Sequence, residues 1–587
     1  MDQLKNLNKR NEIFNEYNKY VSDLDKNSLT KKWWDLFDSK KKFINWIIQL
    51  WNSFANVNNF FDFIDDIKSN NKVLYICWDY DADWICSTVL FSEFCDVIWI
   101  KYKPFIPNRI EDWYWLNYNT LSKIHSSGLW TDIKNNSIIS LDSWVNNIDI
   151  NSDLKELWIN YYIIDHHQES ITCLENKIDQ SKFQINPHLL QNKMSHLLNE
   201  DNISTGLLVL MVWASYLNKS EDIAKATKFI NLNSDLALIT TVTDMMPVTW
   251  INRSLIKLFK DDFLKTDKLR KSFKTIFWDA LQNWKILFDQ EDYNSNDIHK
   301  FIWWTVWPII NSFWRISDPM IAYDYIKNWE WSLDKLYELN NYRKKITWDY
   351  RKEIESISID ELRSDSKYFL FQFDHSKLFT PGIQSILSWI FSNWYNKVVW
   401  IWYEKWDEIR YSFRCPKWIN LKDIFLKSKF EYKWHNQAWV IYINKNELTN
   451  LKSFLSSNNF YREVEDKVEK NILPYRLTNT LINIKTINIL NSFWPYWIWN
   501  PKPTFIVKWI LMKQKLASWT WFIKYTAFWY EKIKILVGGK EMMMYNFWWR
   551  LTVNELFSCK HFVWTLERPF NEYSPIPVFM INKLIYV

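Results

Sequence analysis

The stretch KVLYICWDYDADWIC, residues 72–86, decides the fold of this chain. Its apolar run VLYIC is short enough for a buried strand, and Asp79, Asp81 and Asp83 follow that run at alternating positions. In parallel sheets, ligands bind at the carboxyl ends of the strands. Three carboxylates gathered there repel one another unless cations neutralise them. We therefore expect a cation site at the end of a buried strand rather than a solvated acidic loop.

Further short apolar runs follow, separated by polar or helical sequence: DVIWIKY (96–102), SIISLD (137–142) and YYIIDHH (161–167). This alternation predicts an α/β fold with a parallel sheet. Two of these runs end in polar groups, Asp142 in one and Asp165, His166 and His167 in the other, and Asp244 follows the apolar run LALITTVT. Carboxylates with an imidazole favour Mn²⁺ or Mg²⁺ over zinc. Clusters of this kind commonly hold two ions for phosphoester hydrolysis.

The remaining pattern predicts five regions. Residues 1–70 are expected to form a helical segment and residues 71–322 the α/β domain with the carboxylates, including a helical stretch over 203–290. One long charged helix is expected between lobes, over 323–362 within a connecting region 323–365. A smaller α/β domain is expected over 366–465, and the β-rich residues 466–587 suit a small barrel.

Composition excludes several classes of protein. The chain has 587 residues, 48% of them hydrophobic, and a net charge of +6. This permits a nucleic-acid partner without requiring one. The six cysteines contain no C-x-x-C pair, which argues against a disulfide scaffold or a zinc finger. The polar N-terminus does not resemble a signal peptide, and no apolar run is long enough to span a membrane. We expect a cytoplasmic protein without a membrane partner.

Two residue counts are abnormal, with only 5 glycines but 41 tryptophans. Glycine ordinarily makes up about 7% of residues, and the excess of tryptophan offsets the missing glycine. Many tryptophans lie in turn-like contexts, such as Trp78 and Trp84 beside the aspartates and Trp113 and Trp115 in EDWYWLN. The alternative is a genuinely tryptophan-rich protein that uses its aromatics in cores or for base stacking. Our hypothesis is that most tryptophan letters stand for glycine, because UGA, which some genetic codes read as tryptophan, was translated under the wrong table.

With that substitution, the chain resembles a known family over residues 70–587. DYDAD followed by DHH resembles the DHH phosphoesterase superfamily, and further segments narrow the match to the RecJ-type single-strand-specific exonucleases. FIPNRIEDWYWLN (105–117) resembles the family's PNR…GYGLN segment, and SLDSWV its D-C-G motif, with Ser143 for Cys. The other segments are WPIINSFWRISDP (307–319), YSFR (411–414), KWHNQAW (433–439) and SFWPYWIWNPKPTF (492–505).

The tryptophans that fall where the family has glycine are Trp78, Trp84, Trp113, Trp115, Trp144, Trp307, Trp314, Trp434, Trp439, Trp494, Trp497 and Trp499. The resemblance implies a parallel-sheet DHH catalytic domain, a DHH-associated domain joined to it by a long helix, and a C-terminal OB-type barrel. It also implies two Mn²⁺ or Mg²⁺ ions.

The resemblance also implies residue roles. Asp81 and Asp83 would bind one ion each, Asp142 would bridge the two, and His166 and Asp244 would complete the second ion's ligands. Asp79 and Asp165 would orient these ligands, and His167 would face the scissile phosphate. The DNA phosphates would be held by Arg109, Asn311, Arg315, Ser412, Arg414 and His435. Two departures affect substrate binding, because Ile309 stands where the family has arginine and Lys433 where it has glycine.

The resulting hypothesis is a single-stranded-DNA-specific 5′–3′ exonuclease acting in DNA repair and recombination. Single-stranded DNA is the expected partner, a single-strand-binding protein and a helicase are candidate protein partners, and a monomer is the default state. Two alternatives stay open at this point. One is a DHH phosphodiesterase that acts on short oligonucleotides or cyclic dinucleotides. The other is an inactive DNA-binding replication scaffold.

Overall fold

The computed structural model describes about half of the chain, in segments separated by gaps. These are residues 37, 39–50, 56–78, 82–105, 136–142, 159–167, 183–188, 203–219, 222–248, 250–264, 270–283, 298–364, 366, 368–373, 381–405, 408–415, 438–444, 453, 475–476, 505–508, 512–515, 522–527, 534–538, 561–567 and 578–585.

A five-stranded parallel sheet forms the first layer, with strand order β2-β1-β3-β4-β5. Successive side chains of a strand point to opposite faces. Accordingly, Leu74 and Ile76 join one apolar cluster, whereas Tyr75 and Cys77 join another. The predicted parallel α/β sheet is therefore confirmed. The strands are β1 (Val73–Trp78), β2 (Lys101–Phe105), β3 (Asn136–Leu141), β4 (Asn160–Ile164) and β5 (Gln184–Ile185).

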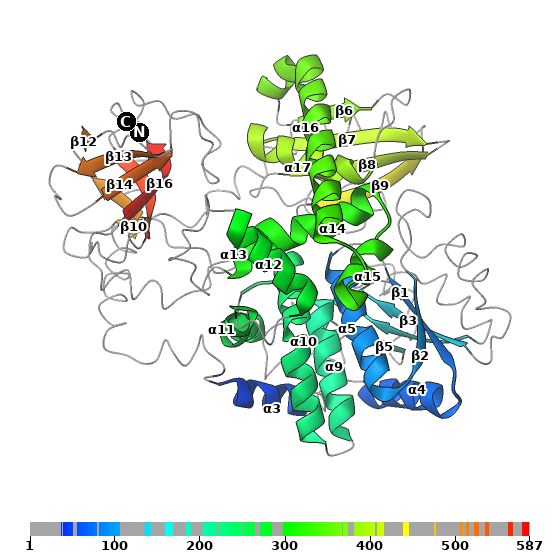
Figure 1. The fold of residues 1–587 in the computed structure, drawn as a ribbon. Coiled ribbons are helices and arrows are strands. Elements are labelled where there is room, and N and C mark those ends of the chain that lie inside the picture. Colours follow the sequence, from blue (N-terminus) through cyan, green and yellow to red (C-terminus); the bar gives the residue numbers. More distant parts are fainter. Residues whose placement is uncertain are drawn as a thin grey trace.

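Helices that cover one face of this sheet share a single apolar core with it. Three of them, α5, α9 and α10, pack against one another, and Figure 1 shows α9 and α10 side by side. Helices make up most of the described parts of 1–70 and 203–290, as expected. The helices are α3 (Lys40–Leu50), α4 (Val57–Ser69), α5 (Ala82–Ile98), α9 (Thr205–Lys219), α10 (Ile223–Thr243), α11 (Trp250–Leu264) and α12 (Lys271–Asn283).

The strand predicted for DVIWIKY is wrong in its first half. Residues 96–98 are the last turn of α5, and β2 begins only at Lys101. Between them, Trp99 has a left-handed backbone with φ 64°. Its N–H reaches the carbonyl of Asp96 at 3.4 Å, and that of Ile100 reaches Cys95 at 3.0 Å, which is the Schellman helix end. One apolar run therefore serves a helix end and the strand after it, a division that periodicity alone does not show.

Left-handed turns also end other helices. Asn71 follows α4 with φ 51°, and Asn396 follows α17 (Pro381–Tyr395) with φ 53°. Asparagine tolerates this conformation better than other residues with a Cβ atom, and glycine is the usual residue there. Trp329 occupies the same kind of position after α15 (Met320–Asn328), with φ 61°. Trp99 and Trp329 thus lie at positions that favour glycine.

The single helix predicted over 323–362 is also corrected, because the structure has two helices there. The first, α15, ends at Asn328, and the second, α16 (Leu333–Arg363), begins after Ser332. The hydroxyl of Ser332 accepts the N–H of Lys335 at 3.3 Å, so a side-chain cap starts the second helix. The preceding helices are α13 (Ile298–Phe301), the π-helix η6 (Ile302–Val306) and α14 (Trp307–Ile316).

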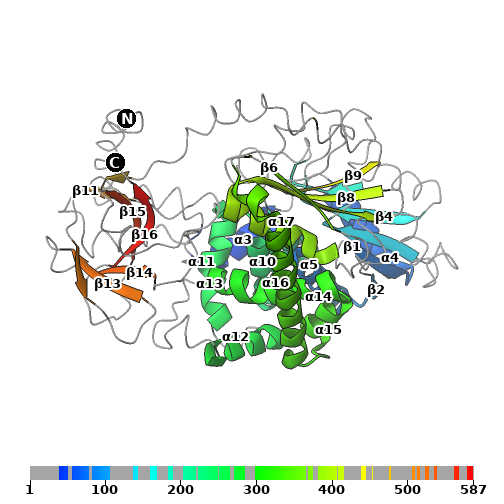
Figure 2. The same ribbon diagram turned by 90° about the horizontal axis from the view of Figure 1, so that it is seen from above.

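A second sheet, of order β6-β7-β8-β9, packs with α16 and α17 around its own apolar cluster. Figures 1 and 2 show α16 running beside α14 and α17 and reaching this sheet. In this sheet β6 pairs with β7 in parallel, whereas the pairs β7–β8 and β8–β9 are antiparallel. The strands are β6 (Tyr368–Gln372), β7 (Val398–Lys405), β8 (Glu408–Arg414) and β9 (Ala438–Asn444).

The helices α14 and α17 meet where Gly382 faces the end of α14. A Cβ atom on Gly382 would lie 2.5 Å from the Cα atom of Arg315, closer than any real contact. The Arg315 guanidinium donates to the carbonyl of Gly382 at 2.7 Å. Glycine is therefore required at this joint, where two backbones touch.

The C-terminal strands form a seven-stranded sheet of order β10-β11-β15-β16-β14-β13-β12. This confirms the β-rich pattern, while an OB-type barrel for residues 466–587 stays a prediction. The strands are β10 (Tyr475–Arg476), β11 (Phe505–Lys508), β12 (Met512–Lys515), β13 (Phe522–Ala527), β14 (Lys534–Gly538), β15 (His561–Glu567) and β16 (Val578–Ile585).

Candidate metal centre

The carboxyl edge of the parallel sheet gathers acidic and imidazole side chains. Asp142 comes directly after β3, and Asp165 directly after the neighbouring strand β4. Asp83 lies in the first turn of α5, just beyond β1, and Asp244 caps the end of α10. Because adjacent parallel strands end at one edge, residues far apart in sequence converge there. Asp79 and Asp81, also predicted for this site, lie outside the described residues.

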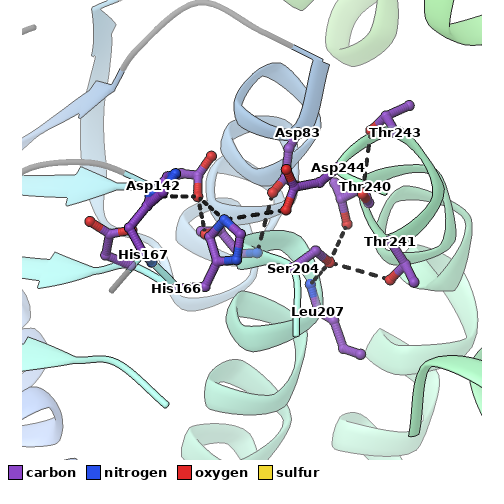
Figure 3. A network of polar contacts seen from close by, with 12 residues as sticks. Asp83, Asp142, His166, His167, Ser204, Leu207, Thr240, Thr241, Thr243 and Asp244 are labelled. Atoms are coloured by element: carbon purple, nitrogen blue, oxygen red, sulfur yellow. Dashed lines mark hydrogen bonds and ion pairs between the residues drawn. The ribbon is translucent and has the colours of Figure 1, made fainter. Parts of the chain in front are cut away.

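Two overlapping groups could each hold a metal ion, one formed by Asp142, His166 and His167 and the other by Asp83, His166 and Asp244. In each group, one ligand atom per residue lies within 4.8 Å of the others. The Nε2 atom of His166 is 3.0 Å from Oδ1 of Asp142 and 3.2 Å from Oδ2 of Asp244. Figure 3 shows these side chains pointing toward one another. His166 is therefore common to both groups.

The donor atoms at His166 fit a divalent cation. Its Nε2 atom is buried and makes no hydrogen bond among the described residues, despite the two carboxylate oxygens nearby. Buried polar atoms are normally hydrogen-bonded. An imidazole nitrogen aimed at two carboxylate oxygens suits a site in which a cation lies between them. Carboxylate oxygens with one imidazole are ligands that suit Mn²⁺ or Mg²⁺.

His167 is oriented by the carboxylate of Asp165. Oδ1 of Asp165 lies 2.7 Å from Nδ1 of His167 and accepts the backbone N–H of the same residue at 3.0 Å. Burial alone would raise the pKa of Asp165, but the charge and hydrogen bonds of His167 outweigh it and lower this pKa to about 2. Burial in turn lowers the pKa of His167. The proton of a neutral His167 is thus held on Nδ1, leaving Nε2 as an acceptor.

Backbone turns set the direction of two of the carboxylates. Asp142 has φ 58°, a conformation that aspartate adopts more readily than most residues, and its N–H donates to the carbonyl of Ile164 at 2.7 Å. After Asp244, Met245 has φ 56° and its N–H bonds to Val242 at 3.2 Å, while the N–H of Met246 bonds to Thr241 at 3.1 Å. This Schellman end places Asp244 at the last turn of α10.

Sequence reasoning missed the polar residues that surround these groups. The amide of Asn186 donates to the carbonyl of His167 at 2.8 Å, and Thr205 contacts both Asp83 and Asp142. Ser204 and Thr205 precede an apolar helical run, a pattern that predicts a helix N-terminus. Nothing in that pattern indicates which distant side chains their hydroxyls contact.

The predicted DNA-contacting residues lie in different settings. Asn311 is buried, and its Oδ1 accepts the indole N–H of Trp314 at 2.9 Å. Ser412 is buried too, with its hydroxyl 3.2 Å from that of Ser385. Arg315 bonds across to Gly382. Arg414 is half-buried on β8, and Arg109 and His435 lie outside the described residues. Phosphate contacts by all six stay a prediction.

Within the described segments, no helix combines the length and apolarity needed to cross a bilayer.

Comparison with known proteins finds similarity only at the level of structure. No family model matches the chain, and no curated protein matches its sequence. RecJ from Thermus thermophilus in complex with Mn²⁺ superposes with a TM-score of 0.63 over 90% of this chain and 71% of that chain, at 13% identity. The Mg²⁺ complex of RecJ from the same organism gives a TM-score of 0.57 at 12% identity, over 90% and 69% of the respective chains. A manganese-bound exonuclease RecJ superposes with a TM-score of 0.52 at 14% identity, over 69% of this chain and 94% of the RecJ chain. The chain therefore shares the fold of the RecJ proteins.

Proposed function

We propose that this chain is a metal-dependent phosphoesterase of the DHH superfamily. The observation that carries the proposal is the convergence of Asp83, Asp142 and Asp244 on the buried Nε2 atom of His166 at the carboxyl edge of the sheet. Repelling carboxylates buried around an imidazole need cations for charge balance. The fold shared with RecJ supports this reading, since those proteins were solved with Mn²⁺ or Mg²⁺.

Asp83, Asp142, His166 and Asp244 would hold the ions, joined by Asp81 as expected from the sequence. Two bound divalent ions supply an activated water and stabilise the leaving oxygen of a phosphodiester. His167 contributes a positioned acceptor, because its Nδ1 is held 2.7 Å from Asp165. Its Nε2 atom is then suited to accept a hydrogen bond from the attacking water beside the phosphate.

The finer proposal is a single-stranded-DNA-specific 5′–3′ exonuclease. Its support is the order of RecJ-like segments along the sequence, together with a second α/β lobe joined to the first through α14, α16 and α17. Single-stranded DNA would pass between these lobes, held at its phosphates by arginine side chains. A role in DNA repair and recombination and a monomeric state complete the proposal.

The proposal includes the hypothesis that most tryptophans in the printed sequence are glycines in the natural protein. Trp99 and Trp329 lie at left-handed helix ends that favour glycine. The buried Trp213 has its ring centroid 3.1 Å from that of Phe94, and its Nε1 atom has no hydrogen-bond partner among the described residues. Aromatic rings normally pack with centroids about 4.5–7 Å apart, and a buried indole N–H normally finds an acceptor. Mass spectrometry of the natural protein would test this, because intact tryptophan at these positions would refute the recoding.

The function is tested with the full chain carrying the residues that mass spectrometry identifies. Single-stranded DNA labelled at its 5′ or 3′ end is digested with and without Mn²⁺, beside a blunt duplex. We expect metal-dependent release of small products from the 5′ end, with the duplex spared. Hydrolysis of dinucleotides without DNA cleavage would favour a small-substrate phosphodiesterase, and DNA binding without any hydrolysis would favour the scaffold.

A further inference from the structure

Thr205 is the first residue of α9 and contacts two of the site's carboxylates. Its hydroxyl donates to Oδ1 of Asp142 at 2.5 Å, and its backbone N–H donates to Oδ2 of Asp83 at 3.3 Å. The residue is fully buried. We infer that Thr205 is a positioning residue that fixes the carboxylates of Asp83 and Asp142 for metal binding, an inference that rests on the proposed function.

The hydroxyl bond matters because of the atom that it reaches. Oδ1 of Asp142 is also the oxygen that lies 3.0 Å from Nε2 of His166. A carboxylate oxygen offers two lone pairs. With the Thr205 hydroxyl on one of them, the orientation of the carboxylate is set, and the same oxygen still faces the imidazole at which an ion would bind. The N–H of Thr205 acts similarly on Asp83, whose other oxygen accepts the Ser87 hydroxyl at 3.3 Å.

Thr205 is itself held by its neighbours in sequence. The hydroxyl of Ser204 lies 3.0 Å from that of Thr240 and 3.3 Å from that of Thr241, both on α10. Ser204 Oγ also accepts the N–H of Leu207 at 3.4 Å, capping α9. Figure 3 shows Ser204 between the two helices.

Gly206 lets the two helices come this close. A Cβ atom at this position would lie 2.5 Å from the methyl group of Thr240, so any larger residue would push α9 away from α10. Helix α10 ends at Asp244, the third carboxylate. The segment 204–206 therefore contacts Asp83, Asp142 and the helix that ends at Asp244.

The test measures Mn²⁺ affinity by titration calorimetry on the full chain carrying its natural residues. Thr205→Val removes the hydroxyl but keeps the shape and the N–H, and we expect it to weaken Mn²⁺ binding about 10- to 100-fold, as the loss of other groups that orient metal ligands does. Thr205→Ser restores the hydroxyl and should bind within about 3-fold of the unchanged chain. Thr347→Val is the matched control, because it removes a buried hydroxyl bonded to the Arg343 carbonyl in α16, away from the site.

Unaltered Mn²⁺ affinity in Thr205→Val, or an equal loss in Thr205→Ser, would overturn the inference. If Thr205→Val does not fold, Thr205→Ala against Thr205→Ser makes the same comparison. The unchanged chain separates the two proposals. Mn²⁺ binding without cleavage of any DNA would overturn the nuclease alone, whereas the absence of Mn²⁺ binding would overturn both.

Discussion

Oδ1 of Asp165 accepts two hydrogen bonds from His167, one from its ring Nδ1 at 2.7 Å and one from its backbone N–H at 3.0 Å. A single carboxylate thus fixes the backbone turn, the orientation of the ring and the position of the proton. The Nε2 atom of His167 is then the acceptor of a ring that belongs to one of the two candidate ligand groups.

Changing Asp165 to Asn should lower the rate of DNA cleavage about 10- to 100-fold, because an amide can hold the ring in the wrong tautomer. Mn²⁺ affinity should also fall, but less than in a variant that loses a ligand, since Asp165 is in neither candidate ligand group and orients His167, which is in one of them. Initial rates on 5′-labelled single-stranded DNA and calorimetric titration check the two statements. A rate equal to that of the unchanged chain would contradict the role given to Asp165.

Asp83→Asn should have opposite effects on stability with and without metal. In EDTA the variant should melt at a higher temperature than the unchanged chain, because one of several buried, mutually repelling charges is removed. With Mn²⁺ the unchanged chain should gain more, as ligand binding stabilises the folded state, and cleavage by the variant should fall more than about 100-fold. Asp62→Asn, an exposed change on α4, serves as the control. Equal melting shifts with Mn²⁺ in both variants would contradict a ligand role for Asp83.

Glu93→Gln tests the ion pairs that join α5 to Arg270 and α15. Glu93 lies 2.8 Å from Arg270 and 3.2 Å from Lys327. Burial alone would raise the pKa of Glu93, but these two charges outweigh it and lower the pKa. The variant should therefore lose about 2 kcal/mol of unfolding free energy at pH 7.

A lowered pKa means that Glu93 stabilises the fold above its unfolded pKa of about 4.3, and that this contribution is lost as the pH falls through the folded pKa. The difference between the variant and the unchanged chain should thus shrink below about pH 4, measured by urea unfolding. The control is Asp65→Asn. Asp65 pairs with Lys219, and the two side chains are 44% and 48% exposed respectively, so this variant should lose less than about 1 kcal/mol of unfolding free energy. A Glu93→Gln effect that does not vary with pH would argue for packing rather than charge.

In a protein that carries tryptophan at all the positions printed in the sequence, Trp99→Gly should raise the free energy of unfolding by about 1 kcal/mol, since a left-handed backbone disfavours a Cβ atom. The side chain is 90% exposed, so little packing is lost. Trp46→Gly, within α3, is the contrasting change and should destabilise by at least about 0.5–1 kcal/mol. The midpoints of urea unfolding of the two variants measure these changes. Destabilisation by Trp99→Gly would argue against glycine at position 99.

Gly382→Ala should destabilise the joint between α14 and α17 by about 1–3 kcal/mol, because its Cβ atom would overlap the backbone of Arg315. Asn393→Ala, on the exposed side of the same helix, should be nearly neutral. Unfolding free energies from urea titrations measure both. Equal effects would mean that the two backbones can separate without cost.

Much of the site was predictable from local pattern. A short apolar run followed by acidic residues predicts a strand end at a ligand edge, and the structure has Asp142, Asp165 and His166 directly after strands β3 and β4. The same local reasoning failed where one run serves two elements, as at residues 96–102, where α5 ends at Ile98 and β2 begins at Lys101. It also failed to predict the helix end at Trp329. Glycine is the residue that indicates a left-handed turn, and the sequence has tryptophan at this position.

The sequence by itself determined the order of strands and helices, the acidic character of the strand ends and the preference for an oxygen-binding cation. These follow from side-chain period and ligand chemistry, which are local properties. Only the tertiary structure decided that Thr205 bonds to Asp142 and Asp83, from which it is separated in the chain by 63 and 122 positions respectively. The same holds for the contact between Gly382 and Arg315. Such contacts depend on how close whole helices approach one another, which is set by packing over the entire core.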